Sequence, residues 1–144
     1  MQVAFFLTPK SETAYLLESF TLRQALEKME YHHYSSMPVL DADGRYVYTL
    51  CQEDCLRIFK SNPRMTFADS EKIVIHDVEH RQDMAAVNIS ATITDLLDKT
   101  LEQNFIPVVD DQGIYIGLVR RRSIIEYCRP LLLDTRTKAA NPAT

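Results

Sequence analysis

Glycine and cysteine are both scarce in this chain, which has three of each in 144 residues. Three glycines leave little material for a backbone loop that cradles phosphate, and the sequence has no Walker loop, glycine-rich dinucleotide turn or Gly-x-Ser-x-Gly motif. His76 and His80 are four residues apart but lack a third metal ligand. No nucleophile, base and orienting group occur together, so we predict a protein that is not an enzyme and has no cofactor or metal.

Long apolar runs, an excess of positive charge and a disulfide framework are missing as well. No stretch approaches the roughly 18 apolar residues of a membrane span, and the first residues lack the basic leader of a signal peptide. A formal net charge of -4 gives no basic surface for nucleic acid. An odd number of cysteines does not form a disulfide framework. We therefore expect a reduced, soluble, cytoplasmic protein with no nucleic-acid or membrane partner.

The sequence does contain an internal repeat, the feature that decides its architecture. Residues 37–47 match residues 106–116 at an offset of 69, and residues 14–22 match residues 85–93 at an offset of 71. The second unit is therefore two residues shorter between its first helix and its Pro-Val strand. The matched pairs include Ala14 with Ala85, Thr21 with Thr92, Pro38 with Pro107, and Gly44 with Gly113.

Each unit predicts the element order β-α-β-β-α, an α/β (α+β) fold. A short apolar segment (14–17 or 85–89) precedes a helix that begins after a Thr cap. A strand then leads into an Asp-x-x-Gly turn and a second strand, and a second helix (53–60 or 123–129) ends the unit. The apolar residues predicted to share one face of the first helix are Leu22, Leu26 and Met29 in one unit and Ile93, Leu96, Leu97 and Leu101 in the other.

The repeat divides the chain into three parts. Residues 1–63 form the first unit, since Pro63 cannot continue a helix. Residues 64–130 contain a connecting segment, whose apolar residues indicate that it packs, and the second unit. We expect residues 131–144 to form a disordered tail, because its last part has little to bury.

The doubled pattern resembles a tandem pair of CBS domains, a Bateman module, of the stand-alone firmicute type. The resemblance rests on Thr-Leu-x-x-Ala-Leu at 21–26, Met-Pro-Val-Leu-Asp at 37–41, Ile-Pro-Val-Val-Asp at 106–110 and Gly-Leu-Val at 117–119, and it covers about residues 5 to 130. It implies two units packed with pseudo-twofold symmetry, commonly dimerised, with adenosine-containing ligands in the clefts between them.

The resemblance also implies which residues meet a ligand in the first cleft. The first strand offers backbone to an adenine edge, the residues before the Pro-Val strand offer hydroxyls, and an Arg-Arg-Arg run begins the last helix, where phosphates bind well. Consecutive helical residues fan out by about 100°, so not all three arginines can face one ligand. The alternative is a solvated basic turn, with Arg122 paired to Glu126. The nucleotide-binding candidates are Thr13, Ala14, Tyr15, Tyr34, Ser35, Ser36, Pro38, Arg120, Arg121 and Arg122, and we expect Arg121→Ala to weaken binding.

A second cleft is expected at the pseudo-symmetric position. Asp54 matches the family's ribose-binding carboxylate, although an Asp in the first turn of a helix is favourable there in any case. Cys51 replaces the family's hydroxyl residue and is a weaker hydrogen-bond partner, while Ser123 replaces the corresponding Asp of the second unit. The candidates for this cleft are Cys51, Asp54, Ala85, Ala86, Phe105 and Pro107, with Met84, Asn104 and Ile106 beside them.

Two functions follow from these expectations. The first is a regulatory module that binds an adenine nucleotide (AMP, ADP, ATP or cyclic di-AMP) and signals to an unidentified protein partner. The resemblance implies that such a module is a homodimer. The second is a ligand-free scaffold for dimerisation or protein-protein interaction. The departures at Cys51, Arg120 and Ser123 are what keep the scaffold alternative open.

Overall fold

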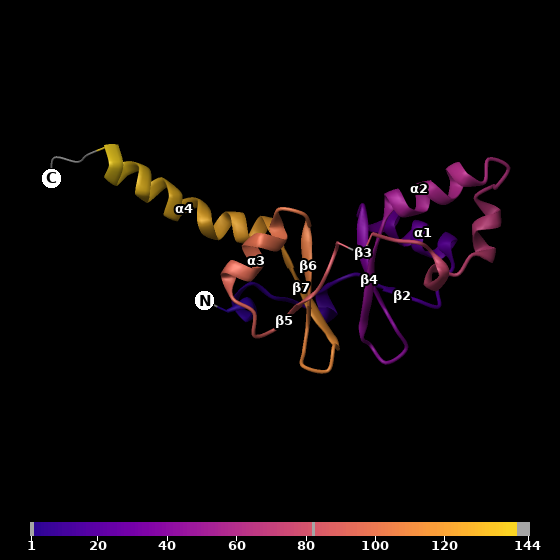
Figure 1. Cartoon of the computed structure of the whole chain (residues 1–144), viewed down its shortest axis with the longest axis horizontal. Helices are drawn as coiled ribbons and strands as arrows, with labels where there is room; N and C mark the ends of the chain where they lie inside the picture. Colours follow the sequence, from indigo (N-terminus) through magenta and orange to yellow (C-terminus); the bar gives the residue numbers. More distant parts are fainter. Residues whose placement is uncertain (1, 82, 141–144) are drawn as a thin grey trace.

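Two small α/β units stand side by side in the structure, a computed structural model that describes residues 2–81 and 83–140 (Figure 1). The strands are β1 (Thr8–Pro9), β2 (Leu16–Leu17), β3 (Ser36–Leu40), β4 (Tyr46–Cys51), β5 (Val87–Asn88), β6 (Phe105–Val109) and β7 (Tyr115–Arg120). The α-helices are α1 (Leu22–His32), α2 (Gln52–Ser61), α3 (Ile93–Thr100) and α4 (Arg121–Ala140). Short 3-10 helices span Val3–Phe6, Lys10–Glu12, Ala68–Lys72 and Ile75–Asp77.

The predicted order β-α-β-β-α is confirmed in both units. One sheet has the order β2-β3-β4 and the other β1-β7-β6-β5. In each unit the short first strand pairs in parallel with the Pro-Val strand, which pairs antiparallel with the next one. Each sheet has its own apolar core, one built around Leu16, Met29 and Leu50, the other around Leu96 and Ile106.

Both first helices begin at the Thr residues that the sequence predicts. The Thr21 hydroxyl accepts a hydrogen bond from the Gln24 backbone N–H, and the Thr92 hydroxyl accepts one from the Asp95 N–H. The Gln24 and Asp95 side chains accept from the Thr backbone N–H groups in return, which completes a capping box at each helix.

The predicted apolar face is correct for α1 but only in part for α3. Leu22 and Met29 are buried, and so is Leu96. By contrast, Leu97 is 40% exposed and Leu101 is 79% exposed, so these two side chains do not share the buried face. Leu101 lies beyond the last turn of α3, which ends at Thr100 after eight residues. Leu97 lies within α3, about 100° around the helix from the buried Leu96, so its side chain points away from the core.

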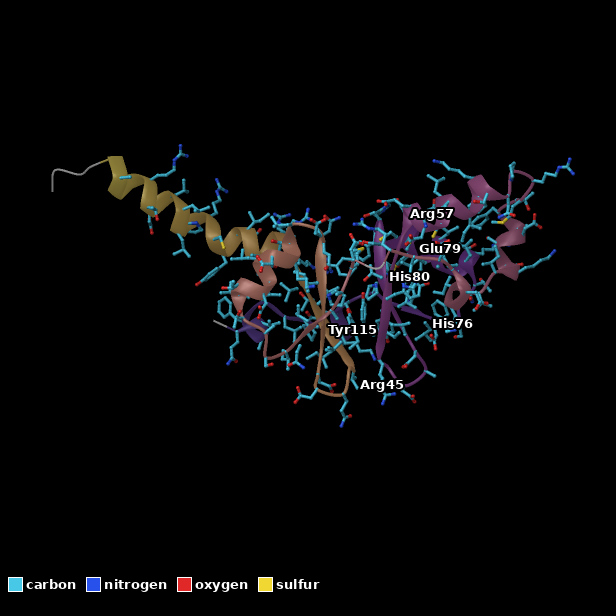
Figure 2. The ribbon with its side chains drawn as sticks, viewed as in Figure 1. Arg45, Arg57, His76, Glu79, His80 and Tyr115 are labelled. Carbon is cyan, nitrogen blue, oxygen red and sulfur yellow. The ribbon has the colours of Figure 1, made fainter. Side chains whose placement is uncertain are left out.

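The hairpin turns join the two units through reciprocal contacts. Gly44 and Gly113 adopt φ values of 84° and 80°, as the Asp-x-x-Gly pattern predicts. The Tyr46 N–H donates to the Gly113 carbonyl over 3.1 Å, and the Tyr115 N–H donates to the Gly44 carbonyl over 3.0 Å. The labelled Arg45 and Tyr115 side chains lie near this junction (Figure 2). The exchanged bonds relate one hairpin to the other by a local twofold axis.

Each unit also contains a segment that comes from the part of the chain predicted to form the other unit. Strand β1, within the 1–63 part, pairs antiparallel with β7 of the second unit, and Val3 and Phe6 lie in the second core. Conversely, Ile75 and Val78 of the connecting segment lie in the first core, and the Ile73 carbonyl accepts from the Leu22 N–H. The N-terminal segment is thus buried in the core of the second unit, and the connecting segment in the core of the first.

Helix α4 continues well past the predicted end at residue 129 and projects away from its sheet (Figure 1). It includes Pro130 and reaches Ala140, so residues 131–140 are helical where a disordered tail was expected; residues 141–144 lie outside the described part. Leu131, Leu132 and Leu133 are at least half exposed, so burial of these side chains does not account for the extension. In the described residues, no helix is both long enough and apolar enough to span a membrane.

Candidate functional site

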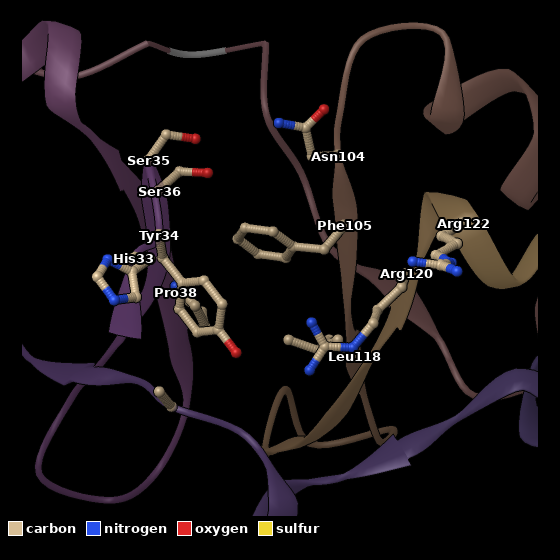
Figure 3. Close-up of a pocket in the computed structure, with 11 residues that line it drawn as sticks. His33, Tyr34, Ser35, Ser36, Pro38, Asn104, Phe105, Leu118, Arg120 and Arg122 are labelled. Carbon is tan, nitrogen blue, oxygen red and sulfur yellow. The ribbon is translucent and has the colours of Figure 1, made fainter. Parts of the chain in front are cut away.

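A cavity of about 300 Å³ lies between the two units (Figure 3). Its wall comes from the segments that precede β3 and β6, from the strands themselves, and from the β7–α4 junction. The lining residues are Ala14, His33, Tyr34, Ser35, Ser36, Pro38, Asn104, Phe105, Leu118, Arg120 and Arg122.

Backbone hydrogen bonds fix the two segments that face each other across this cavity. The Gln52 N–H donates to the Ser35 carbonyl over 2.9 Å, and the Arg121 N–H donates to the Asn104 carbonyl over 2.9 Å. Each bond ties the residue before a Pro-Val strand to the start of the following helix. The side chains of Ser35 and Asn104 are thereby left free to point toward the space between the units (Figure 3).

Two aromatic rings enter the cavity from opposite sides. Tyr34 extends from the first unit and Phe105 from β6 of the second unit (Figure 3). Tyr34 is held from behind by a stacked contact with His32, with ring centroids 5.5 Å apart. His33 ends α1 in the left-handed conformation at φ 59°, and this turn directs the chain into the cavity wall. Such a pair of rings can receive a flat aromatic group.

The same cavity is positively charged on its second-unit side. Arg120 ends β7 and Arg122 lies in the first turn of α4, next to backbone N–H groups that a helix N-terminus leaves free. Arg122 Nε donates to Glu126 Oε1 over 2.8 Å, which is the pairing expected of a solvated basic turn. Among the described residues Arg120 forms no ion pair, so its charge is available to an anion.

The cavity brings together seven of the ten residues predicted for the first cleft. They are Ala14, Tyr34, Ser35, Ser36, Pro38, Arg120 and Arg122. The remaining three, Thr13, Tyr15 and Arg121, have other partners. The Thr13 hydroxyl bonds with that of Tyr115 over 2.9 Å, and the Lys28 ammonium donates to the Tyr15 carbonyl. Arg121 Nε donates to the Gln103 carbonyl over 3.1 Å, so Arg121 braces the backbone instead of lining the cavity.

A second cavity of about 280 Å³ lies at the pseudo-symmetric position. It is lined by Ser35, Ser36, Cys51, Gln52, Glu53, Arg81, Met84, Glu102 and Asn104. Of the residues predicted for this cleft, Cys51 lines the cavity, beside Met84 and Asn104. Asp54, Ala85, Ala86 and Pro107 do not line it, and Phe105 faces the first cavity instead.

The repeat shows why the two cavities differ in charge. At an offset of 69, Arg120 corresponds to Cys51 and Arg122 corresponds to Glu53. Burial raises the pKa of the Cys51 thiol to about 11, with the neighbouring Asp54 and Glu53 charges acting in the same direction, so this thiol is neutral. Where the first cavity presents two cations, the second presents a neutral thiol and a carboxylate. An anionic ligand is therefore favoured in the first.

Asp54 is fully buried and caps helix α2. Its Oδ2 accepts a hydrogen bond from the Cys51 N–H over 2.9 Å, and its Oδ1 lies 3.4 Å from an Arg57 nitrogen. This geometry agrees with the helix-start alternative rather than with ribose binding. We expect Asp54→Ala to lower the free energy of unfolding by about 1–3 kcal/mol in urea titrations, because the buried Cys51 N–H loses its partner.

Asp95→Ala is the matched control for Asp54→Ala. Asp95 caps α3 in the same way, but Asp95 and Thr92 are exposed, so water can replace the lost bond and the loss should be smaller. A ribose-binding role would give the opposite pattern, in which Asp54→Ala lowers affinity for AMP while stability hardly changes.

Several residues of the two cavities were not predicted. His33 and Leu118 line the first, and Glu53, Arg81 and Glu102 line the second. Asn104 lines both cavities, and so does Ser35, its counterpart at the offset of 69. Because Ser35 is predicted to line the first cleft, this correspondence also predicts Asn104 there.

The histidines considered as metal ligands have other contacts. His76 Nδ1 lies 2.9 Å from Glu18 Oε2, and the His80 ring stacks on Tyr48 with centroids 3.9 Å apart. In the part of the chain that the structure describes, no group of three or more His, Cys, Asp or Glu side chains is arranged to hold a metal ion.

Comparison with known proteins agrees with this architecture. The sequence profile of the CBS domain matches residues 9–61 and 75–129. Among solved structures, a CBS domain protein from Streptococcus pneumoniae TIGR4 is 27% identical, with 90% of this chain and 87% of that chain covered and a TM-score of 0.80. Comparison with curated protein sequences finds no match.

Two further structures share the fold and were solved with nucleotides. CbpB from Listeria monocytogenes, in complex with c-di-AMP, is 19% identical over 90% of this chain and 96% of its own, with a TM-score of 0.78. CBSX2, in complex with AMP, is 22% identical over 90% of this chain and 97% of its own, with a TM-score of 0.72. The repeat, the two sheets and the profile match together place this chain in the CBS domain family, with two CBS domains in tandem.

Proposed function

We propose that this protein is a non-catalytic regulatory module that binds an anionic adenine nucleotide in the cavity lined by Arg120 and Arg122. The observation that carries the proposal is the composition of that one cavity. It combines the backbone of the half-buried Ala14, two residues before β2, with two aromatic rings and with two cations beside a helix N-terminus. Those are the groups that a base and a phosphate need.

The adenine and the phosphate of a nucleotide each have a counterpart in the cavity. The adenine ring lies between Tyr34 and Phe105, where stacking on aromatic side chains contributes about 1–3 kcal/mol per base. Its polar edge meets the backbone of Ala14. The phosphate lies against Arg120 and Arg122 at the start of α4, where guanidinium groups and helix N–H groups act together.

The solved relatives support an adenine ligand. CbpB and CBSX2, which share the fold, were crystallised with c-di-AMP and AMP respectively. Both ligands contain adenine and phosphate, the two groups for which the cavity has partners. For this chain the proposal covers AMP, ADP, ATP and cyclic di-AMP, since all of them present those groups.

Nucleotide binding would act by changing how the two units and their partners associate. Because the ligand touches both units, it favours any arrangement in which they hold the cavity closed. We propose that this change is transmitted through a homodimer to a protein partner in the cytoplasm, where the three free thiols Cys51, Cys55 and Cys128 remain reduced.

The proposal is tested by thermal unfolding of the full chain with AMP, ADP, ATP, cyclic di-AMP, cyclic di-GMP and S-adenosylmethionine. A ligand at a hundredfold excess over its dissociation constant stabilises by about 2.7 kcal/mol, a shift in Tm on the order of 5 to 10 °C. We expect such a shift with at least one anionic adenine nucleotide and none with cyclic di-GMP, the control for charge and size. No shift with any ligand would contradict the proposal and favour the scaffold alternative.

A further inference from the structure

Gln103 is a buried polar residue whose side-chain amide pairs with the backbone of Ala85. It lies between α3 and β6 and is 1% exposed. The Ala85 N–H donates to Gln103 Oε1 over 3.4 Å, and Gln103 Nε2 donates to the Ala85 carbonyl over 3.1 Å and to the Phe105 carbonyl over 3.4 Å. In the reverse orientation, the amide NH2 would face the Ala85 N–H, and the amide oxygen would face the two carbonyl oxygens. These contacts therefore determine the orientation of the Gln103 amide.

The position that Gln103 covers in the second unit is open in the first. Ala85 is the repeat counterpart of Ala14 at the offset of 71, and Ala14 lines the first cavity whereas Ala85 does not line the second. The counterpart of Gln103 at the offset of 69 is Tyr34, which has no amide. Among the described residues, no side-chain amide bonds to Ala14.

A glutamine amide and an adenine edge offer the same pair of groups. Adenine presents an acceptor at N1 beside a donor at N6, and a primary amide presents Oε1 beside Nε2. Both therefore satisfy the N–H and the carbonyl of one residue at once. An adenine that entered the second cleft would have to displace Gln103, leaving a buried amide to find new partners, which is costly.

We propose that Gln103 occupies the adenine position of the second cleft, so that the chain binds one adenine nucleotide instead of two. This inference rests on the proposed function for its first site. Arg121, whose Nε donates to the Gln103 carbonyl, holds the backbone of this residue in place. Arg121, the arginine between the two that line the first cavity, thus helps to keep Gln103 in the adenine position of the second cleft.

Charge acts against phosphate in the second cleft even when Gln103 is removed. Glu53 and Glu102 line that cavity, while its Arg81 already pairs with Asp83. Neutral adenosine is therefore the appropriate probe for a newly opened adenine position, and AMP is the probe for the first site.

The experiment titrates AMP and adenosine into wild type and Gln103→Ala, with stoichiometry from calorimetry and the amide signals of Ala14 and Ala85 from NMR. In wild type we expect one AMP per chain, with the Ala14 signal shifting and the Ala85 signal unchanged. In Gln103→Ala we expect adenosine stoichiometry to rise from one to two, with Ala85 now responding. Gln112→Ala, at an exposed glutamine in the β6–β7 turn, is the matched control and should behave as wild type.

The outcomes separate this inference from the proposed function. The inference would be overturned, with the first site intact, if wild type bound two equivalents of AMP or adenosine with a shift at Ala85. It would also be overturned if a folded Gln103→Ala variant still bound only one equivalent of adenosine. The wild-type NMR result decides the matter if Gln103→Ala does not fold. If wild type binds neither ligand, the proposed function fails, and adenosine binding at Ala85 in Gln103→Ala alone would still uphold the role of Gln103. If neither wild type nor Gln103→Ala bound AMP or adenosine, both the proposed function and the proposed role of Gln103 would be contradicted.

Discussion

Replacing Gly117 with alanine will lower the free energy of unfolding by about 2–4 kcal/mol, through overpacking and backbone strain together. Gly117 has a φ of 151°, a conformation that other residues rarely adopt. A Cβ at this position would lie 2.1 Å from the Thr8 carbonyl oxygen and 3.1 Å from the Pro9 Cα. Both are backbone atoms, so neither can rotate away, and β1 would have to leave β7.

Gly113→Ala is the control that separates strain from collision. Gly113 also has a positive φ, 80°, but a Cβ there would meet no heavy atom within 4 Å. Only the conformational strain of about 1–2 kcal/mol applies. Urea unfolding of both variants measures the difference. Equal losses of unfolding free energy in the two variants would mean that β1 is not packed against β7. The N-terminal segment would then not be part of the second unit.

This exchange of segments marks the limit of what the sequence predicts about the fold. The repeat located both hairpins and both capped helices, because Thr caps and Asp-x-x-Gly turns act within a few residues. Whether Val3 joins one core or the other depends on packing across the whole chain, which an apolar residue type does not encode. The same holds for α4, whose helical extension beyond residue 129 buries few side chains.

A cavity lies where the first cleft is predicted, but several of its individual contacts differ from the predicted ones. The resemblance to CBS domains implies that Ala14, Tyr34 and Arg120 meet in one cleft, and all three line the first cavity. The offsets do not show which face a side chain takes, so Arg121 and Phe105 were assigned to contacts that the structure does not have. Gln103 gave no signal, because a polar residue just after a helix is ordinarily exposed and its burial follows from the fold.

Arg120→Ala will weaken AMP binding by about 10- to 100-fold, the loss of roughly 1.5–3 kcal/mol that accompanies removal of a charged hydrogen-bond partner. Arg120 lines the first cavity and, among the described residues, has no carboxylate partner, so a phosphate would be its principal one. Calorimetry at several salt concentrations measures the effect, which should diminish as salt screens the charge.

Arg121→Ala is the matched control, since it removes the same charge one residue away. Its Nε is committed to the Gln103 carbonyl, so we expect stability to fall while affinity for AMP changes by less than about threefold. Adenosine adds a second control, because Arg120→Ala should leave its binding unchanged if Arg120 meets the phosphate. Equal losses of AMP affinity in the two variants would show that the arginine run acts through its general charge. The cavity geometry predicts instead that the affinity depends on Arg120, whose side chain faces the ligand.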